Sequence, residues 1–207
     1  MIMFYDRKDA GKQLANALDN YRGMEGVIVL AIPRGGVEVG YEVAHYLRAP
    51  FNLIITRKLP YPHNPESGFG AIAEDGSTFM FDFAETELSR ETIEKIVEEQ
   101  EEEIDQRKKI LRKGEEFPDI RDKTVILVDD GLAMGSTMRA SITMCRKQGP
   151  ESIVVAVPVA GQRVYHEMQK IADDVVVLET PYNFRAVAQV YENWYDVTDN
   201  EVIAIMK

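Results

Sequence analysis

Two adjacent carboxylates followed by a small loop are the residues of this sequence best suited to chemistry. Asp129 and Asp130 end an apolar run, and residues 131–135 lead from them to the hydroxyl side chains of Ser136 and Thr137. Ionised carboxylates accept hydrogen bonds, so the aspartate pair suits the hydroxyl groups of a sugar. The start of a helix offers unpaired N–H groups and a positive dipole end, which suit a phosphate. One loop can therefore hold both ends of a ribose 5-phosphate.

The phosphate end is predicted to lie on five consecutive residues, Ala133, Met134, Gly135, Ser136 and Thr137. Gly135 lets the backbone approach a ligand closely, and the two hydroxyl groups add donors. A Walker A loop fits less well, because Gly131 and Gly135 are one residue too close together and no lysine precedes Ser136. Residues 34–40 also lack the G-x-G-x-x-G pattern of a dinucleotide site.

A plainer interpretation of the same segment is a strand that ends in a solvated aspartate pair and caps a helix. The Asp-Asp pair alone favours that interpretation. The complete order of apolar strand, two aspartates, small loop, glycine and Ser-Thr favours a phosphate site instead.

Short apolar runs alternate with helical patterns along the chain and are expected to position this loop. The runs predict strands at residues 27–32, 51–56, 124–128, 152–157 and 175–178. The patterns between and after them predict helices at residues 37–48, 136–148, 162–171 and 183–190. Strands separated by helices predict an α/β fold with a Rossmann-like, doubly wound and mainly parallel sheet. In such sheets ligands bind beyond the carboxyl ends of the strands, where Asp129 stands.

The middle of the chain interrupts this alternation. Residues 57–76 are rich in proline and glycine and predict a long functional loop. A short hairpin is expected around residues 74–77. Residues 85–113 predict a long charged helix, with Ser89 as a candidate N-terminal cap and an acidic run that we interpret as a solvated face.

Composition limits the classes of function. The 207 residues are enough for one domain, and the net charge of −11 argues against nucleic-acid binding, which rewards clustered Lys and Arg. Cys145 is the only cysteine, so neither an intrachain disulfide nor a cysteine-rich metal site is expected. The first residues lack the apolar core of a signal peptide, and no run approaches the roughly 18 apolar residues of a membrane span. We expect a cytoplasmic protein with no membrane partner.

Residues 125–137 resemble the binding motif for 5-phosphoribosyl-1-pyrophosphate (PRPP) of type I phosphoribosyltransferases, which place two acidic residues and a small glycine-containing loop after a strand. Residues 32–36, Ile-Pro-Arg-Gly-Gly, stand where that family carries its pyrophosphate loop. Residues 57–60, 68–76 and 191–202 resemble a bacterial and archaeal group of predicted phosphoribosyltransferases with unassigned substrate. The resemblance implies the type I phosphoribosyltransferase fold as a single domain over residues 1–207. Its core would span about 24–180 and a small hood about 180–207.

The resemblance also implies a reaction and a set of roles. Ribose 5-phosphate would pass from PRPP to a nucleobase-like acceptor with release of pyrophosphate, and Asp129 and Asp130 would be the catalytic pair that holds the ribose hydroxyls. The pyrophosphate would lie on Arg34, Gly35, Gly36, Arg57 and Lys58. Mg²⁺ would bind mainly through PRPP rather than in a protein metal site. The family often has a non-proline cis peptide in the pyrophosphate loop, here the Arg34–Gly35 bond. A flexible loop over residues 60–76 would close over the site.

Two positions depart from the family pattern. Ala133 stands where 6-oxopurine transferases carry an aspartate, so a mechanism of that kind is disfavoured. Met134 replaces the usual threonine, which weakens the phosphate grip by about 1 kcal/mol. The acceptor base stays unidentified, with aromatic side chains of residues 181–185 and 191–195 as candidates to stack on it.

Other hypotheses stay open. A PRPP- or nucleotide-sensing regulatory protein can be built on the same fold without transfer activity. A hydrolase-like or receiver-like protein that uses Asp129 for metal binding is a third hypothesis, but it leaves Arg34 and its glycines unexplained. A homodimer is possible, since members of the family often pair so that a partner closes the site.

Overall fold

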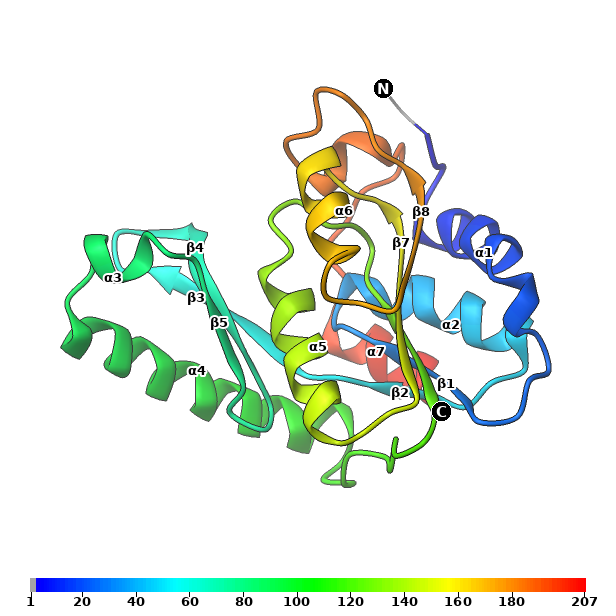
Figure 1. Cartoon of the computed structure of the whole chain (residues 1–207), viewed down its shortest axis with the longest axis horizontal. Coiled ribbons are helices and arrows are strands. Elements are labelled where there is room, and N and C mark those ends of the chain that lie inside the picture. The colour runs from blue at the N-terminus through cyan, green and yellow to red at the C-terminus, as the bar shows by residue number, and fades with distance from the viewer. Residues whose placement is uncertain (1–2) are drawn as a thin grey trace.

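The computed structural model describes residues 3–207 apart from the side chain of Glu66, so residues 1 and 2 of the predicted domain lie outside the description. Five strands form a wholly parallel sheet in the order β2-β1-β6-β7-β8 (Figure 1). Their bounds are β1 Val27–Ala31, β2 Phe51–Leu53, β6 Thr124–Val128, β7 Ser152–Val159 and β8 Asp174–Glu179. Every predicted strand is present, and the predicted α/β fold with a parallel sheet is confirmed.

Helices cover both faces of this sheet (Figure 1). One layer holds α1 (Arg7–Ala17) and α2 (Gly35–Leu47), and the opposite layer holds α5 (Ser136–Lys147) and α6 (Gln162–Met168). Alternate side chains of one strand enter opposite layers: Leu127 packs with the α5 layer, whereas Ile126 packs with the α1 and α2 layer. Strands buried on both faces are therefore continuous apolar runs, which explains why the sequence pattern located them.

The sheet has a switch point between β1 and β6. From β1 the chain passes through α2 to β2 on one side, whereas β6 pairs with β1 on its other side. Ala31 lies opposite Val128 in the register, and the N–H of Ile32 donates to the carbonyl of Val128 at 2.9 Å. The loops that follow these two strands therefore leave the sheet side by side, which is where ligands bind in open α/β sheets.

The predicted long loop at residues 57–76 is wrong, because this segment forms two strands of a second sheet. β3 (Thr56–Tyr61), β4 (Asn64–Ala73) and β5 (Thr78–Met80) are antiparallel, with β4 in the centre. Pro60 is tolerated because β3 is an edge strand and its register shifts there. Apolar side chains of β3 and β4 pack against the long helix at residues 90–111. This packing outweighs the local preference for a loop. The β4–β5 hairpin expected around residues 74–77 is confirmed.

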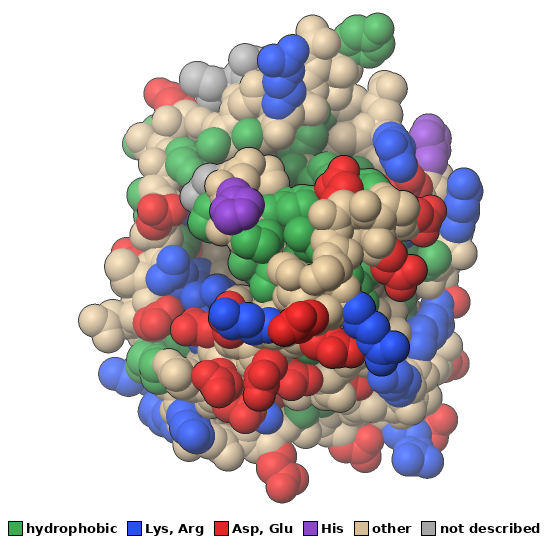
Figure 2. All heavy atoms as spheres, turned by 90° about the vertical axis from the view of Figure 1, so that its left-hand side faces the viewer, with side chains coloured by type: hydrophobic (Ala, Val, Ile, Leu, Met, Phe, Trp, Pro, Cys, Tyr) green, Lys and Arg blue, Asp and Glu red, His purple; other side chains and the backbone are tan. Residues whose placement is uncertain are grey.

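The predicted helix over residues 85–113 is divided in two. α3 (Ala84–Glu87) ends at Leu88, whose extended backbone interrupts the helix, and α4 (Arg90–Leu111) begins after Ser89. The Ser89 hydroxyl accepts the N–H of Thr92 at 3.2 Å, as an N-terminal cap does. The acidic run is exposed, as predicted, except that Gln100 is buried. Figure 2 views the end of the molecule that carries α3 and the start of α4, where acidic and basic side chains lie around an apolar area.

The C-terminal segment contains elements that the sequence analysis did not predict in this form. The helix expected at 183–190 is reduced to the 3₁₀ turn η2 (Val187–Val190), because the backbone of Ala186 is extended and the Gln189 side chain caps it. α7 (Asp199–Ile205) packs between α2 and α4, and a further 3₁₀ turn η1 (Asp19–Tyr21) follows α1. Of the helices within residues 3–207, none is both long and apolar enough to cross a membrane.

Candidate functional site

The loop after β6 is fixed at its middle and open at its tip. Leu132 is buried, its N–H donates to the carbonyl of Val159 at 2.9 Å, and its own carbonyl accepts the N–H of Gly161 at 3.2 Å. Beyond it Met134 is 54% exposed. Gly135 has a φ of +73° and precedes the first residue of α5, a conformation that favours glycine. The loop thus presents its tip and the start of α5 to solvent.

The backbone N–H groups of residues 133–137 are available for a ligand. In the part of the chain that the structure describes, no protein group accepts a hydrogen bond from any of them. The first N–H groups of a helix have no partner within the helix, and their dipoles add a partial positive charge. This arrangement suits the phosphate end that the sequence predicts here.

Asp129 and Asp130 lie beside this loop and face polar groups. The N–H of Asp130 donates to Asp129 Oδ1 at 2.8 Å, and Arg7 Nε donates to Asp130 Oδ2 at 2.7 Å. Burial and the charge of Asp130 raise the pKa of Asp129 well above its usual value. Burial also raises the pKa of Asp130, whereas Arg7 acts in the opposite direction.

The loop after β1 packs directly on the two aspartates. A Cβ added to Gly35 would lie 1.9 Å from Asp130 Oδ2, and one added to Gly36 would lie 2.9 Å from Asp129 Cα. Only glycine permits this approach. The predicted pyrophosphate loop and the aspartate pair, about 95 positions apart in the sequence, therefore form one site at the switch point.

The cis peptide bond of this loop is not the one predicted. It joins Pro33 to Arg34 rather than Arg34 to Gly35. The physical reason lies in α2, which begins at Gly35 and has the N–H of Val37 donating to the Arg34 carbonyl at 3.1 Å. The Arg34–Gly35 bond already belongs to the first helical turn, where peptide bonds are trans.

Three arginines from different elements gather next to this loop. Arg34 Nη1 lies 3.6 Å from Asp199 Oδ1 of α7. Arg57 of β3 donates from Nε to Gln100 at 3.2 Å and lies 4.0 Å from Glu103. Both acceptors are on α4, at the spacing that shares one helix face.

Arg107, which the sequence analysis did not single out, lies on the same face of α4 one turn after Glu103. Burial and the positive charges of Arg57 and Arg34 lower the pKa of Arg107. Lys58 follows Arg57 in β3, where successive side chains point to opposite faces, and its side chain lies beside Gly68. The structure therefore brings Arg34 and Arg57, two of the predicted residues, together with Arg107.

Arg7 is a second residue of the site, after Arg107, that sequence reasoning missed. Its side chain is 3% exposed, its Nη1 donates to the carbonyl of Tyr195 at 2.8 Å, and its guanidinium lies 3.9 Å from the centre of the Trp194 ring. Glu38 Oε2 lies 3.8 Å from Nη1. Arg7 is 123 positions from Asp130 and belongs to no motif, so no local signal indicates the contact.

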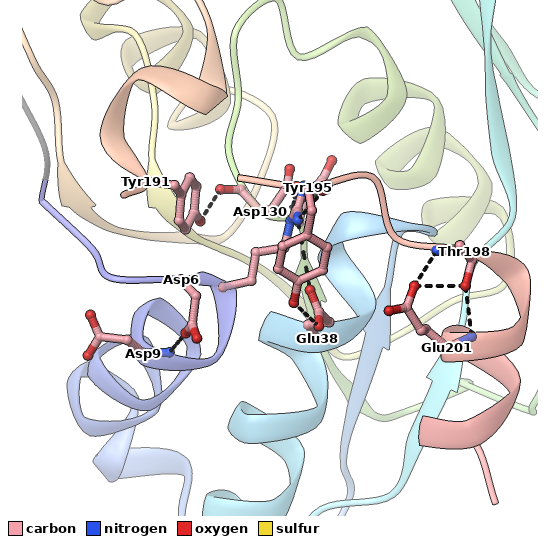
Figure 3. Close-up of polar contacts among 10 residues, drawn as sticks. Asp6, Asp9, Glu38, Asp130, Tyr191, Tyr195, Thr198 and Glu201 are labelled. Atoms are coloured by element: carbon pink, nitrogen blue, oxygen red, sulfur yellow. Dashed lines mark hydrogen bonds and ion pairs between the residues drawn. The ribbon is translucent and has the colours of Figure 1, made fainter. Parts of the chain in front are cut away.

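The C-terminal segment encloses this arginine through Trp194 and Tyr195. The Tyr191 hydroxyl donates to the carbonyl of Asp130 at 2.7 Å, and the Tyr195 hydroxyl donates to Glu38 at 2.6 Å (Figure 3). Burial and the bond to Glu38 raise the pKa of Tyr195 to about 12. Tyr191, Trp194 and Tyr195, which the sequence suggested for base stacking, are thus engaged with Arg7 and its partners. Phe184 lies beside Gly161 and packs against the cluster that contains Phe4 and Tyr191.

The fold and the site agree with the type I phosphoribosyltransferases that the sequence resembles. The shared features are a parallel sheet, a switch-point site with free amides and an acidic pair, and a neighbouring arginine cluster. The sequence matches the family described as phosphoribosyl transferase domain over residues 4–193, so this chain belongs to that family.

Individual relatives in sequence and structure are consistent with this family. The chain is 38% identical over 208 residues to the Mycobacterium tuberculosis protein named "Putative phosphoribosyl transferase Rv0571c", and the match covers all of this chain. It spans 47% of that relative, about half its length. The crystal structure of TT1426 from Thermus thermophilus is 35% identical, with a TM-score of 0.82 and coverage of 99% of this chain and 98% of that one. The AQ2163 protein from Aquifex aeolicus shares the fold at 13% identity, with a TM-score of 0.51 and coverage of 89% and 80%.

Proposed function

We propose that this protein transfers ribose 5-phosphate from PRPP to a nucleobase-like acceptor and releases pyrophosphate. The supporting observation is the meeting, at the β1–β6 switch point, of the free N–H groups of residues 133–137 with the carboxylates of Asp129 and Asp130. A sugar phosphate needs donors at one end and acceptors at the other, and one loop supplies both. We propose residues 1–207 as one domain, with the core and hood as the sequence predicts.

Each part of PRPP has a proposed place. The 5-phosphate lies on the loop of Ala133, Met134, Gly135, Ser136 and Thr137. The ribose hydroxyls lie on Asp129 and Asp130, and the diphosphate lies on Gly35, Gly36, Arg34, Arg57 and Arg107. Lys58 is left out because β3 turns it away from Arg57.

The chemistry follows from this placement. The bond from C1 of the ribose to the diphosphate oxygen breaks while a nitrogen of the acceptor forms a new bond to C1. Positive charge develops on the sugar ring, and the aspartate pair offers negative charge next to it. The arginines stabilise the charge that collects on the leaving diphosphate. The protein contributes positioning and electrostatic stabilisation rather than a covalent intermediate.

Mg²⁺ fits this site as a companion of the diphosphate. The proposed diphosphate end is lined by glycine amides and arginines, which bind an anion rather than a bare cation. Within the described residues there is no group of three or more His, Cys, Asp or Glu side chains that could hold a metal. Mg²⁺ prefers phosphate oxygens and waters, and bound to PRPP it would neutralise the leaving group further.

A PRPP- or nucleotide-sensing protein without transfer activity is the second candidate. The engagement of Tyr191, Trp194 and Tyr195 with the Arg7 cluster favours it, since these rings are then not free to stack on a base.

Incubation with Mg-PRPP and a panel of purine and pyrimidine bases, followed by assay of pyrophosphate release, separates the two candidates. We expect turnover with at least one base and a loss of roughly 100-fold or more in Asp129→Asn/Asp130→Asn, the scale for removing transition-state stabilisation. Asp105→Asn on the exposed face of α4 is the matched control and should not change the rate. Binding of PRPP without turnover for any base would support the sensor, and unchanged turnover in the double variant would place the site elsewhere.

A further inference from the structure

We propose that Arg7 is a positioning residue that holds Asp130 in one orientation and in its ionised form, so that the Asp129–Asp130 pair can accept the ribose hydroxyls. The inference rests on the proposed function for its purpose, but the contacts on which it stands involve only protein groups. Arg7 belongs to no motif. It is the first residue of α1 and lies 123 positions before Asp130 in the sequence.

The contacts of Arg7 use three separate surfaces of one guanidinium group. Nε donates to Asp130 Oδ2, Nη1 donates to the Tyr195 carbonyl, and the flat face lies on Trp194 at 3.9 Å. A planar group with directed donors is needed for this pattern, and a lysine ammonium cannot reproduce it. The arrangement therefore fixes the orientation of the carboxylate as well as its charge.

The reason for such a device is the cost of two adjacent buried carboxylates. The Asp130 side chain is 13% exposed and its neighbour Asp129 also carries a carboxyl group. Burial and like charge both favour protonation of one member of the pair, and a protonated carboxyl loses acceptor capacity. An opposite charge in direct contact restores the ionised form. Oδ2 is committed to Arg7, and an ionised carboxylate keeps further lone pairs for a ligand.

Other charged groups around Asp130 do not take this role. The titratable groups that face it or Arg7 are Asp129 in its own loop, Glu38 in α2, and Tyr191 and Tyr195 in the C-terminal segment. The first two are acids, and burial keeps both tyrosines neutral by raising their pKa. Arg7 is the cation among them.

The test is a carboxyl-carbon NMR titration of the two aspartates between about pH 3 and pH 8, the range in which perturbed carboxyl groups titrate. The proteins compared are the wild type, Arg7→Met, Arg7→Lys and the control Arg90→Met, whose side chain is exposed on α4. We expect Arg7→Met to raise the apparent midpoint of the pair by about one to three pH units. Arg7→Lys should keep the midpoint near that of the wild type, and Arg90→Met should leave it unchanged. Equal midpoints in Arg7→Met and the wild type would overturn the proposal.

The affinity for Mg-PRPP, measured over the same pH range, reports on the orientation of the Asp130 carboxylate. Acceptor carboxylates must be ionised, so binding should weaken as the pH falls through the midpoint of the pair, and this loss should begin at higher pH in Arg7→Met. Arg7→Lys should weaken binding at every pH without moving the profile. If the NMR midpoints shift but no protein binds PRPP, the proposed function fails and the inference about Arg7 stands.

A measurement on the wild type covers the case in which Arg7→Met does not fold. The Nε–H resonance of Arg7 should shift with the same midpoint as the Asp130 carboxyl carbon, because the two groups share a hydrogen bond. An Nε–H signal that stays constant through the carboxyl titration would contradict the proposal.

Discussion

Close packing at Gly35 determines whether the two halves of the site can meet. Its Cα lies against the carboxylate that Arg7 holds, so a single methyl group would overlap Asp130 Oδ2. Gly36 stands in the same relation to the backbone of Asp129. The sequence placed both glycines in a ligand loop, but it gave no sign that their immediate neighbour is the aspartate pair.

Substitution of Gly35 by alanine should therefore disturb the acidic pair rather than the fold as a whole. We expect Gly35→Ala to cost about 1–3 kcal/mol of stability, as overpacking does, and to weaken PRPP binding by roughly tenfold or more as Asp130 moves from Arg7. Calorimetric titration with Mg-PRPP measures the effect. Gly161→Ala is the control, since its added methyl would make only ordinary contacts with Phe184. Equal affinities in the two variants would mean that Asp130 does not need its present position.

At the level of single residues, the site residues that could be predicted are those that are adjacent in the sequence. Asp129, Asp130 and residues 133–137 are adjacent in the chain, so their order carried a recognisable pattern. Arg7 and Arg107 reach the site through tertiary contacts, and an isolated arginine in a helix has many ordinary explanations. Adjacency in sequence can also mislead: Arg57 and Lys58 are consecutive in β3, and successive side chains of a strand point to opposite faces.

Among the elements, the parallel strands were predictable and the small sheet was not. Strands buried on both sides must be apolar and β-branched, so residues 124–128 could be located to the residue. Residues 57–76 carry many prolines and glycines, which locally favour a loop. Their pairing depends on α4, which lies beyond them in the sequence and packs against Leu59, Phe69 and Ile72.

A buried ion pair joins the small sheet to α4. Glu74 at the β4–β5 turn contacts Arg112 at the end of α4, both side chains are at most 4% exposed, and Glu74 Oε1 also accepts the N–H of Ile55 at 3.0 Å. Removal of one partner leaves an uncompensated buried charge, which costs about 3–5 kcal/mol. We expect urea unfolding to show this loss in Glu74→Gln and in Arg112→Met.

Two comparisons make this prediction specific to the buried pair. Arg90→Ala breaks an exposed pair with Glu94 on the same helix and should cost less than about 1 kcal/mol. The double variant Glu74→Gln/Arg112→Met leaves no unpaired charge and should recover part of the loss. A loss below about 1 kcal/mol in Glu74→Gln would show that the pair does not hold the sheet to the helix.

Across the whole molecule, the N-terminal segment pairs with residues 190–192 next to the switch point. The N–H of Phe4 donates to the carbonyl of Val190, and the N–H of Glu192 donates to the carbonyl of Phe4, both at 2.9 Å. This pairing carries Arg7 to Asp130 and brings Tyr191 over the same turn. The chain has a net charge of −11, but Arg34, Arg57 and Arg107 form a local cationic cluster next to the switch point. Net charge is a sum over the whole chain, so composition alone indicated no anion site.

The central claim is that the loop after β6 binds a phosphorylated pentose, and amide NMR during titration with ribose 5-phosphate tests it most directly. The account predicts that the largest shifts fall on the N–H groups of residues 133–137, that Asp129→Asn/Asp130→Asn reduces them, and that ribose without phosphate does not produce them. Amides of residues 133–137 that stay unmoved while the ligand saturates another surface, or that never respond to it, would contradict the account.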